Sequence, residues 1–245
     1  SGDYPQIQRM VLEASDWEGF VERKAQALSE GRYIGLGLAN FVKGTGRGPF
    51  EPVTVRVSAS GKIFVSTGAA AMGQSTKTML AQIVSDQLGG ALENVIVSAG
   101  DTGTISMGLG GFNSRQAVMA GSSAHLAALK LREKILTVGA RLLEENIDQL
   151  EFEIDAIRIK GSAQKNVKLG DIARMLGGTP GFALPEGVSP GMEVTESFVC
   201  NEMAYANGAA VAEVEVDVET GGVSVKKIVI AHDCGRVINP MLVDG

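Results

Sequence analysis

Hydrophobic and polar positions along the chain follow two periods, one of about two residues and one of about 3.6. Alternation and β-branched content predict strands at residues 33–41, 53–58, 63–67, 95–98, 152–159, 193–200, 208–218 and 223–231. Apolar side chains at helical spacing predict helices at residues 16–30, 76–88, 115–145 and 171–176. Helices and strands are therefore interleaved in the first part of the chain, and strands dominate the last part.

Local signals indicate where several of these elements begin, turn and end. Ser15 and Glu18 form a capping-box pattern at the start of the first predicted helix, and Gly31 follows its end. The apolar stripe expected on this helix consists of Trp17, Val21, Ala25 and Leu28. Ser60-Gly61 and residues 219–222 are turn signals between strand patterns, so each predicts a hairpin.

This order of elements predicts an α+β fold with mixed sheets and packed helices. The expected organisation is a helical lead-in at residues 1–32, a region with two glycine loops at 33–176, a Gly/Pro linker at 177–191 and a strand-rich return segment at 192–245. The sequence contains no repeat of the solenoid type.

Composition and charge argue against several classes of partner. The 245 residues are 44% hydrophobic and 20% charged, which suits a globular chain with a full core. A net charge of −6 without long charged blocks, with 5% aromatic residues, disfavours binding to nucleic acid or an anionic membrane. No apolar run of about 18 residues and no signal peptide is visible, so a cytoplasmic location is the default expectation. Cys200 and Cys234 are too few for a disulfide framework or a cysteine-held metal.

Two glycine-rich loops precede predicted helices. The first, GAAAMGQSTK at residues 68–77, misses the phosphate-binding P-loop pattern because Gln74 stands where that pattern has lysine. The second, AGDTGTISMGLGGFNS at residues 99–114, lacks the dinucleotide-binding fingerprint. Each leads to a helix N-terminus, whose free N–H groups favour an anion, although an isolated loop of this kind is as readily an ordinary tight turn. Two loops in one chain favour an elongated ligand, and the neutral amide of Gln74 favours an uncommon cofactor over a triphosphate.

Four sequence blocks in a fixed order carry a family resemblance: AAMGQSTKTMLAQIVSDQLG, GDTGTISMGLGGFNSRQAVMAGSSAHLAA, NGAAVAEVEVDVETGGV and HDCGRVINPMLVDG. From about Tyr33 to Gly245 the chain resembles the molybdopterin-binding large subunit of the xanthine dehydrogenase and aldehyde oxidase family of molybdenum hydroxylases. The resemblance implies the fold of that family's molybdenum-cofactor-binding domain. It also implies an oxidoreductase that hydroxylates an aldehyde, a purine or an N-heteroaromatic substrate, with water as the source of oxygen.

The resemblance implies roles for individual residues. Gln74 is the implied catalytic residue, which hydrogen-bonds an oxo ligand of the molybdenum, and Gly73 and Ser75 contact the cofactor at the same turn. Contacts to the pterin and its phosphate are implied for Gly111, Phe112, Asn113, Ser114, Arg115 and Gln116. A position near the distal nucleotide end is implied for Asp233, Cys234 and Ile238. No side chain is implied to ligate the metal, because the dithiolene sulfurs of the pterin hold it.

The chain departs from the family pattern in ways that bear on function. Ala71, Ser75 and Ser106 stand where the family commonly has glutamate, glycine and proline. The family's catalytic carboxylate lies in a Gly-Val-Gly-Glu motif beyond the last shared block, and no such motif occurs up to Gly245. We therefore expect the isolated chain to be inactive and to self-associate or need a partner.

The resemblance also implies cofactors and partners. The cofactor is molybdenum-molybdopterin, with the cytosine dinucleotide form as one option. Iron–sulfur clusters and FAD are expected on partner subunits, since this chain lacks the four cysteines that a cluster needs. The remaining part of the subunit and a small-molecule substrate complete the expected set. A function of another class stays open, namely a non-catalytic scaffold that has kept the fold. His125, in an alanine-rich helix, is more simply a packed or surface residue than a ligand.

Overall fold

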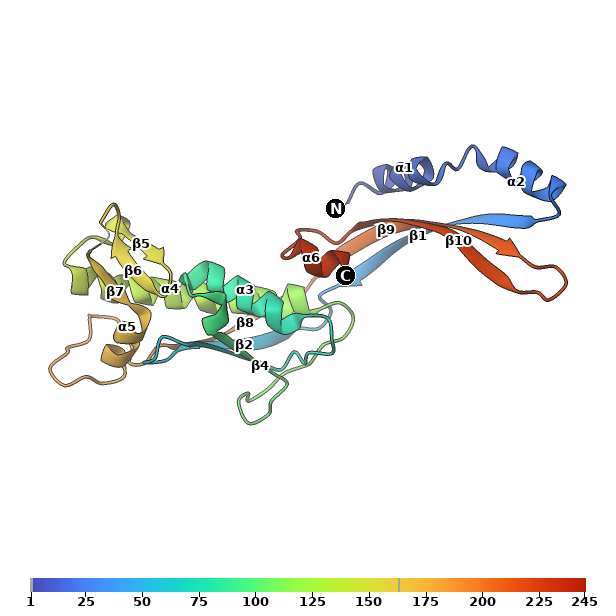
Figure 1. Cartoon of the computed structure of the whole chain (residues 1–245). Helices are drawn as coiled ribbons and strands as arrows, with labels where there is room; N and C mark the ends of the chain where they lie inside the picture. Colours follow the sequence, from blue (N-terminus) through green and yellow to red (C-terminus); the bar gives the residue numbers. More distant parts are fainter. Residues whose placement is uncertain (1, 163) are drawn as a thin grey trace. The chain divides into compact units, whose positions relative to one another are not determined.

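The computed structural model describes residues 2–162 and 164–245. The helices are α1 (Tyr4–Ser15), α2 (Phe20–Ser29), α3 (Thr76–Leu88), α4 (Ser122–Leu143), α5 (Leu169–Leu176) and α6 (Pro240–Asp244) (Figure 1). The strands are β1 (Tyr33–Thr45), β2 (Phe50–Val57), β3 (Ile63–Thr67), β4 (Val95–Ala99), β5 (Leu150–Glu153), β6 (Ala156–Ile159), β7 (Asn166–Lys168), β8 (Glu193–Val199), β9 (Ala204–Val216) and β10 (Val223–Asp233). Short 3-10 helices cover Leu92–Asn94 and Ile147–Gln149, and a π-helical turn covers Ala117–Gly121.

These elements form an α+β fold, as the sequence pattern predicts. They assemble into two compact units. One consists of the chain up to Thr45 together with Ala204–Pro240, and the other of Gly46–Met203 together with Met241–Gly245. Among the helices of the described residues, none combines the length and the apolar character needed to cross a membrane.

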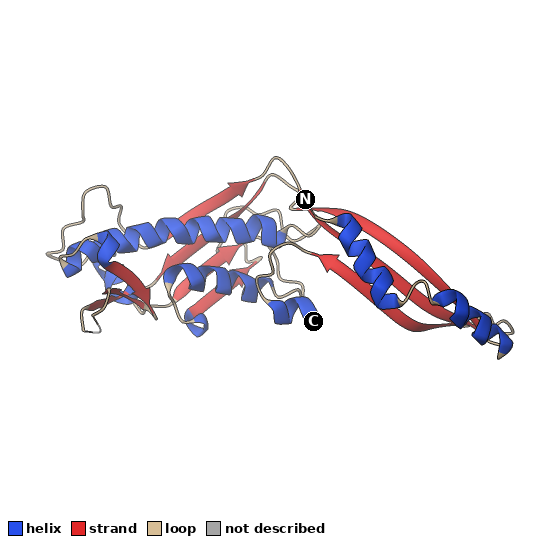
Figure 2. Cartoon of the chain, turned by 90° about the horizontal axis from the view of Figure 1, so that it is seen from above, coloured by secondary structure: helices blue, strands red, loops and turns tan. Residues whose placement is uncertain are grey.

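The first unit is a three-stranded antiparallel sheet in the order β1-β9-β10, with two helices packed on one face. β1 pairs with β9 along its whole length, from Tyr33 opposite Val216 to Thr45 opposite Ala204. α1 packs on β9 and β10, and α2 packs on β1 (Figure 2). Val11 of α1 has no exposed surface and forms a small apolar core with the inward residues of β9.

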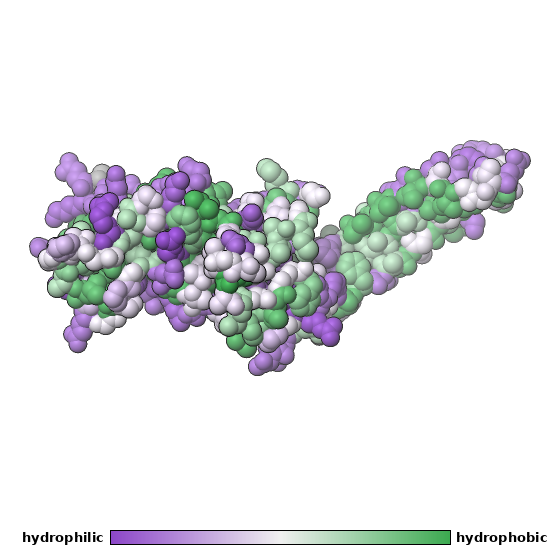
Figure 3. Space-filling view, turned by 90° about the horizontal axis from the view of Figure 1, so that it is seen from below, coloured by the Kyte–Doolittle hydropathy of each residue, from purple (hydrophilic) through white to green (hydrophobic). Residues whose placement is uncertain are grey.

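The other face of this sheet is apolar and open within the described residues of the unit. Ile228 pairs with Ala212 and Ile230 with Ala210, so their side chains point away from the α1 side, where Val211 is buried. The large apolar residues of β10 on this face are between 58% and 64% exposed: Val223, Val225, Ile228 and Ile230. Hydrophobic surface follows this unit in the space-filling view (Figure 3). Patches of this kind favour association.

The second unit is built on a four-stranded sheet in the order β4-β3-β2-β8, with α3 and α4 packed on it. β3 runs parallel to β4, and the other neighbours are antiparallel. Val53, Val55 and Val57 alternate along β2 as buried residues and share the main core with Leu131 and Ile135 of α4. A small antiparallel sheet, β5-β6-β7, and α5 complete the unit. The sheet and the two helices position both glycine loops at the N-terminal ends of α3 and α4.

Several elements agree with the predictions from the sequence pattern. α3 has the predicted bounds and ends at Gly89, which adopts the left-handed conformation with a φ of 62°. β2 and β3 form the predicted hairpin, in which Gly61 donates its N–H to the carbonyl of Ser58 at 2.9 Å. β9 and β10 form the second predicted hairpin across residues 217–222.

The prediction for the first helix is wrong in its start and in its buried face. Ser15 ends α1 instead of capping the next helix, because Asp16 adopts a left-handed φ of 53° that stops the helix there. α1 itself was not predicted. Of the expected stripe, Trp17 packs against the small core of this unit, but Val21 is 75% and Leu28 is 58% exposed, whereas Ala27 is buried.

Two further elements differ from the predictions. Residues 152–159 belong to two strands, β5 and β6, because Asp155 adopts a left-handed φ of 57° in the turn between them. The long helix was predicted nearly correctly: helical residues run from Gln116 through a π-helical turn at Ala117–Gly121 into α4, which ends at Leu143. The π-helical turn was not predicted, and Arg115 precedes the helix, next to Asn113 and Ser114 with left-handed φ values of 50° and 51°.

The boundaries of the two units differ from the expected domain boundaries. β1 shares a sheet with β9 and β10, so residues 33–45 join the strands near the end of the chain. Residues 177–191, the expected linker, lie inside the second unit. Ser1, part of the expected lead-in, lies outside the described residues. Pairing between strands far apart in sequence causes the difference, and local composition does not report such pairing.

Candidate functional site

The first glycine loop runs from the end of β3 to the start of α3. Gly73 has a φ of 101°, a conformation that favours glycine. Ser75, the N-cap of α3, has a left-handed φ of 62°, and its side chain makes no capping hydrogen bond. The first N–H groups of α3 therefore have no side-chain cap, and the positive end of the helix dipole is available to an anion.

The second glycine loop ends in two residues with left-handed φ values before the π-helical turn, Asn113 and Ser114. Asparagine tolerates this region, whereas for Ser114 it costs about 1–2 kcal/mol. Such strain persists only where the surroundings hold it, and it clusters at functional sites. Gln116, the N-cap of the π-helical turn, makes no side-chain capping hydrogen bond. Both loops thus end at helix starts that lack a side-chain cap.

Gln116 joins the two loops through its buried amide. Its Nε2 donates to the carbonyl of Ala70 at 2.7 Å, and its Oε1 accepts hydrogen bonds from Nε2 of Gln74, at 2.7 Å, and from Oγ1 of Thr76. Oε1 of Gln74 accepts the N–H of Met72 at 2.6 Å. The structure therefore brings Gln74 and Gln116, both predicted site residues, into direct contact.

A cavity of about 560 Å³ lies against this hydrogen-bonded network. It is lined by Met72, Gln74, Thr76, Met79, Gly111, Phe112, Asn113, Ser114, Arg115, Gln116 and Ala117. Phe112 is 48% exposed, so a flat apolar surface is available at the rim. The lining exposes mainly apolar surface, which includes Met72, Met79 and Phe112, together with amides, hydroxyls and two helix starts, and this combination suits a ligand that has both a ring system and an anionic group.

Arg115 differs from its neighbours because its side chain is directed into the protein. It has no exposed surface, and Nη1 donates to Oε2 of Glu51 at 2.5 Å and to the carbonyl of Gly110 at 2.6 Å. Nε donates to the carbonyl of Arg47 at 2.8 Å, and Nη2 donates to that of Phe50. The guanidinium is thus bound by protein groups and supports the second loop from inside.

Asp233, Cys234 and Ile238 lie in the first unit, at and beyond the end of β10. Oδ1 of Asp233 accepts the N–H of Gly235 at 2.8 Å and fixes the turn that follows the strand. Cys234 is a free, exposed thiol. Nδ2 of the buried Asn207 lies 3.4 Å from Oδ2 of Asp233, which places a second polar group beside this turn.

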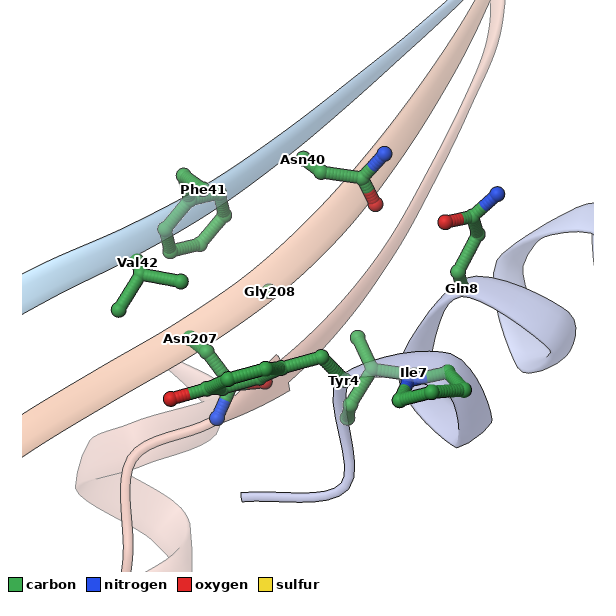
Figure 4. Close-up of a pocket in the computed structure, with 9 residues that line it drawn as sticks. Tyr4, Ile7, Gln8, Asn40, Phe41, Val42, Asn207 and Gly208 are labelled. Carbon is green, nitrogen blue, oxygen red and sulfur yellow. The ribbon is translucent and has the colours of Figure 1, made fainter. Parts of the chain in front are cut away.

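Asn207 also lines a separate cavity of about 480 Å³ in the first unit. The cavity lies between the start of α1 and strands β1 and β9, with Tyr4, Ile7 and Gln8 from the helix and Asn40 and Asn207 from the strands in its wall (Figure 4). Oδ1 of Asn207 is buried without a hydrogen-bond partner. The cavity and Asp233 are therefore neighbours within this unit.

Sequence reasoning missed Glu51, Thr76 and Asn207. Glu51 carried a signal, because it stands two residues before Val53 on β2 and so falls on the buried side of the alternation. A charged residue at such a position needs a buried partner. Asn207 had no comparable signal, since its burial depends on α1 and β10.

The two histidines lie in different units of the chain. His125 is exposed on α4, in agreement with the simpler of the two interpretations. His232 stacks on Phe41, with ring centroids 5.6 Å apart. Across residues 2–162 and 164–245, no group of three or more His, Cys, Asp or Glu side chains is arranged to hold a metal ion.

Comparison with known proteins identifies the family. The sequence model of the molybdopterin cofactor-binding domain matches residues 10–245. The chain belongs to this family. Its resemblance to the xanthine dehydrogenase and aldehyde oxidase family is thereby confirmed, and both glycine loops lie within the matched residues.

Relatives and solved structures agree with this assignment. The chain is 34% identical to the gamma subunit of the 6-hydroxypseudooxynicotine dehydrogenase complex of Paenarthrobacter nicotinovorans, over 100% of the chain and 30% of that protein. It is 30% identical to the nicotine 6-hydroxylase large subunit of the same organism, over 100% of the chain and 31% of the relative. Quinoline 2-oxidoreductase from Pseudomonas putida 86 superposes with a TM-score of 0.87 at 30% identity, over 99% of the chain and 32% of that structure. The chain thus spans about a third of the length of these proteins.

Proposed function

We propose that the chain is part of the molybdenum-cofactor-binding subunit of an oxidoreductase that hydroxylates an aldehyde, a purine or an N-heteroaromatic substrate with oxygen from water. The observation that carries the proposal is the hydrogen-bonded pair of Gln74 and Gln116 beside the cavity, in a chain of the molybdopterin family. Relatives named for nicotine 6-hydroxylation and quinoline oxidoreduction favour the N-heteroaromatic class. Because the chain spans about a third of these relatives, the activity is proposed for the complete subunit.

The residues around the cavity suit this cofactor. The helix starts at Ser75 and Gln116 lack side-chain caps and suit the pterin phosphate. Gln74 uses one Nε2 hydrogen for Gln116, and the other is the proposed donor to an oxo ligand of the metal. Gly73 supplies the turn, and Arg115 supports the loop from inside.

The remaining residues are proposed to contact either the pterin or the nucleotide end of the cofactor. Gly111, Phe112, Asn113 and Ser114 form the part of the cavity wall proposed to face the pterin. Asp233, Cys234 and Ile238 are proposed at the nucleotide end, with the cytosine dinucleotide as one form. When bound, the molybdenum cofactor supplies the two-electron oxidation of the substrate. The protein residues are proposed to bind and orient the cofactor.

Partner subunits are part of the proposal. The two electrons taken from the substrate need acceptors, and Cys200 and Cys234 cannot hold an iron–sulfur cluster that needs four thiolates. We therefore assign iron–sulfur and flavin groups to partner chains. One relative is named as a subunit of a complex and another as a large subunit, which supports this assignment. A cytoplasmic location remains a prediction from the sequence.

Analysis of the native multi-chain complex tests the proposal. Molybdenum is measured by mass spectrometry and the pterin by fluorescence after oxidative release, and both are expected in amounts equal to the chain. Turnover of an N-heteroaromatic, an aldehyde and a purine in ¹⁸O-labelled water should place the label in the product of at least one of them. A complex without molybdenum and pterin would indicate the scaffold alternative instead.

A further inference from the structure

Glu51 is a buried carboxylate at the point where the two glycine loops meet. Its side chain has no exposed surface, and it projects from the inward side of β2 beside Val53. A Cβ built on Gly68 would lie 2.5 Å from Cα of Gly108 and 2.7 Å from Oε1 of Glu51. The backbone at the start of the first loop, the backbone of the second loop and this carboxylate therefore pack together without space for a side chain.

The second oxygen of Glu51 holds the second loop. Oε2 accepts the N–H of Leu109 at 3.0 Å, the N–H of Gly110 at 3.1 Å and Nη1 of Arg115 at 2.5 Å. The same Nη1 donates to the carbonyl of Gly110 at 2.6 Å. One carboxylate thus ties together residues 109 and 115, the two ends of the segment that carries Phe112, Asn113 and Ser114.

The contacts of Glu51 are connected to the cavity through Arg115. Arg115 is followed by Gln116, whose amide reaches Gln74, Thr76 and the carbonyl of Ala70. A displacement of Arg115 would move Gln116 and release the amide of Gln74. The ends of the two loops are therefore coupled through the Glu51–Arg115 pair.

A buried ion pair adds little net stability, because removing both charges from water costs about as much as their attraction returns. The pair with its surrounding hydrogen bonds is instead suited to fixing one loop conformation, in which Asn113 and the strained Ser114 keep their left-handed φ values. The cost of leaving either charge unpaired opposes any other arrangement of the loop.

We propose that Glu51 is a positioning residue for the cofactor site: it holds residues 109–116 in the conformation in which Gln116 contacts Gln74. This inference rests on the proposed function above, since the cofactor that the loop serves is assigned there. Glu51 itself lies behind the loop and is fully buried, so its effect passes through Arg115 and the loop backbone.

The test compares Glu51→Gln with Ile172→Ala in the complete enzyme. Ile172 is a fully buried core residue of α5 that does not line the cavity, so its truncation lowers stability without touching the loops. Thermal stability, molybdenum and pterin content, and amide hydrogen exchange of residues 109–116 are measured for both variants. At a comparable loss of stability, Glu51→Gln is expected to reduce retained cofactor about tenfold or more and to speed exchange at Leu109 and Gly110, whereas Ile172→Ala should do neither.

Equal cofactor content in the two variants, or unchanged exchange at Leu109 and Gly110, would overturn the proposal. If Glu51→Gln does not give a folded complex, Glu51→Asp takes its place. Aspartate keeps the charge opposite Arg115 but is one methylene shorter, so faster exchange at Leu109 and Gly110 is again expected, and unchanged exchange again overturns the proposal. Absence of molybdenum and pterin from the unmodified complex would refute the proposed function, while the exchange of residues 109–116 would still decide the role of Glu51.

Discussion

The amide of Gln74 donates from Nε2 to Oε1 of Gln116 at 2.7 Å, and this hydrogen bond joins the loop before α3 to the loop before α4. Oε1 of Gln74 accepts the N–H of Met72 at 2.6 Å, which fixes the orientation of the amide. One Nε2 hydrogen of Gln74 remains for a ligand. The pair therefore presents a donor whose direction is set by two other contacts.

Gln74→Ala in the complete enzyme should reduce turnover much more than folding. A lost hydrogen bond to the cofactor corresponds to on the order of 1–3 kcal/mol, or about five- to 150-fold in rate. Gln149→Ala, at an exposed glutamine next to β5, is the control and should change neither property. Steady-state kinetics and thermal unfolding are measured on both. Parallel losses of activity and thermal stability in Gln74→Ala would contradict the assigned role.

Gly111→Ala should weaken cofactor retention by displacing Gln116. A Cβ on Gly111 would lie 1.7 Å from Nε2 of Gln116, so that side chain has to move and lose its hydrogen bonds to Ala70 and Gln74. We expect a cost of about 1–3 kcal/mol in the free energy of unfolding and a fall in bound molybdenum.

Gly103→Ala is the matched control for this substitution. It lies in the same loop, and its Cβ would meet only Asp101, at 3.2 Å from Oδ1. The two variants are compared by metal analysis of the purified complex and by thermal unfolding. Full molybdenum content in Gly111→Ala would show that the contact between the two glutamines is not needed to retain the cofactor.

Local sequence predicted those features of the site that depend on residues close together in the chain. Turn signals and helical periodicity gave α3 and its end at Gly89, and the two glycine loops were recognised from their residues and from the family blocks. The contact between Gln74 and Gln116 was not predicted, because it depends on how α3 and α4 pack on one sheet.

The features that sequence reasoning missed depend on partners far along the chain. Glu51 is buried because Arg115 and the N–H groups of residues 109 and 110 surround it. Arg115 was expected to contact the cofactor, yet its charge is directed to Glu51. α1 ends because Asp16 adopts a left-handed conformation, and a capping-box pattern does not reveal this.

Ser75→Gly should stabilise the second unit. Ser75 has a φ of 62° and a ψ of 27°, and its side chain makes no capping hydrogen bond, so a glycine removes strain without the loss of a cap. The gain is reduced by the greater freedom of glycine in the unfolded chain, and we expect about 0.5–1 kcal/mol in the free energy of unfolding. Urea denaturation measures it. Ser60→Gly, in a turn where the serine has no positive φ and bonds Ser58, should give no gain. A lower urea midpoint for Ser75→Gly than for the unmodified chain would contradict the prediction and show that the serine side chain stabilises the folded state.

Association of the 245-residue chain should depend on the open face of the β1-β9-β10 sheet. Ile228 and Ile230 are 58% and 62% exposed there, next to Val223 and Val225, and an exposed apolar strand face favours pairing with a second copy. We expect Ile228→Thr/Ile230→Thr to lower the average mass seen by light scattering at high concentration. Threonine is β-branched, so the strand itself should persist.

The matched control makes the same chemical change outside that face. Ile147 and Ile154 are 45% and 74% exposed in the second unit, and Ile147→Thr/Ile154→Thr should leave the concentration dependence of the average mass unchanged. Both double variants remove the same apolar groups, so a general gain in solubility would appear equally in each. A parent chain that stays monomeric over the whole concentration range, or an equal fall in mass for both variants, would show that this sheet face does not drive association.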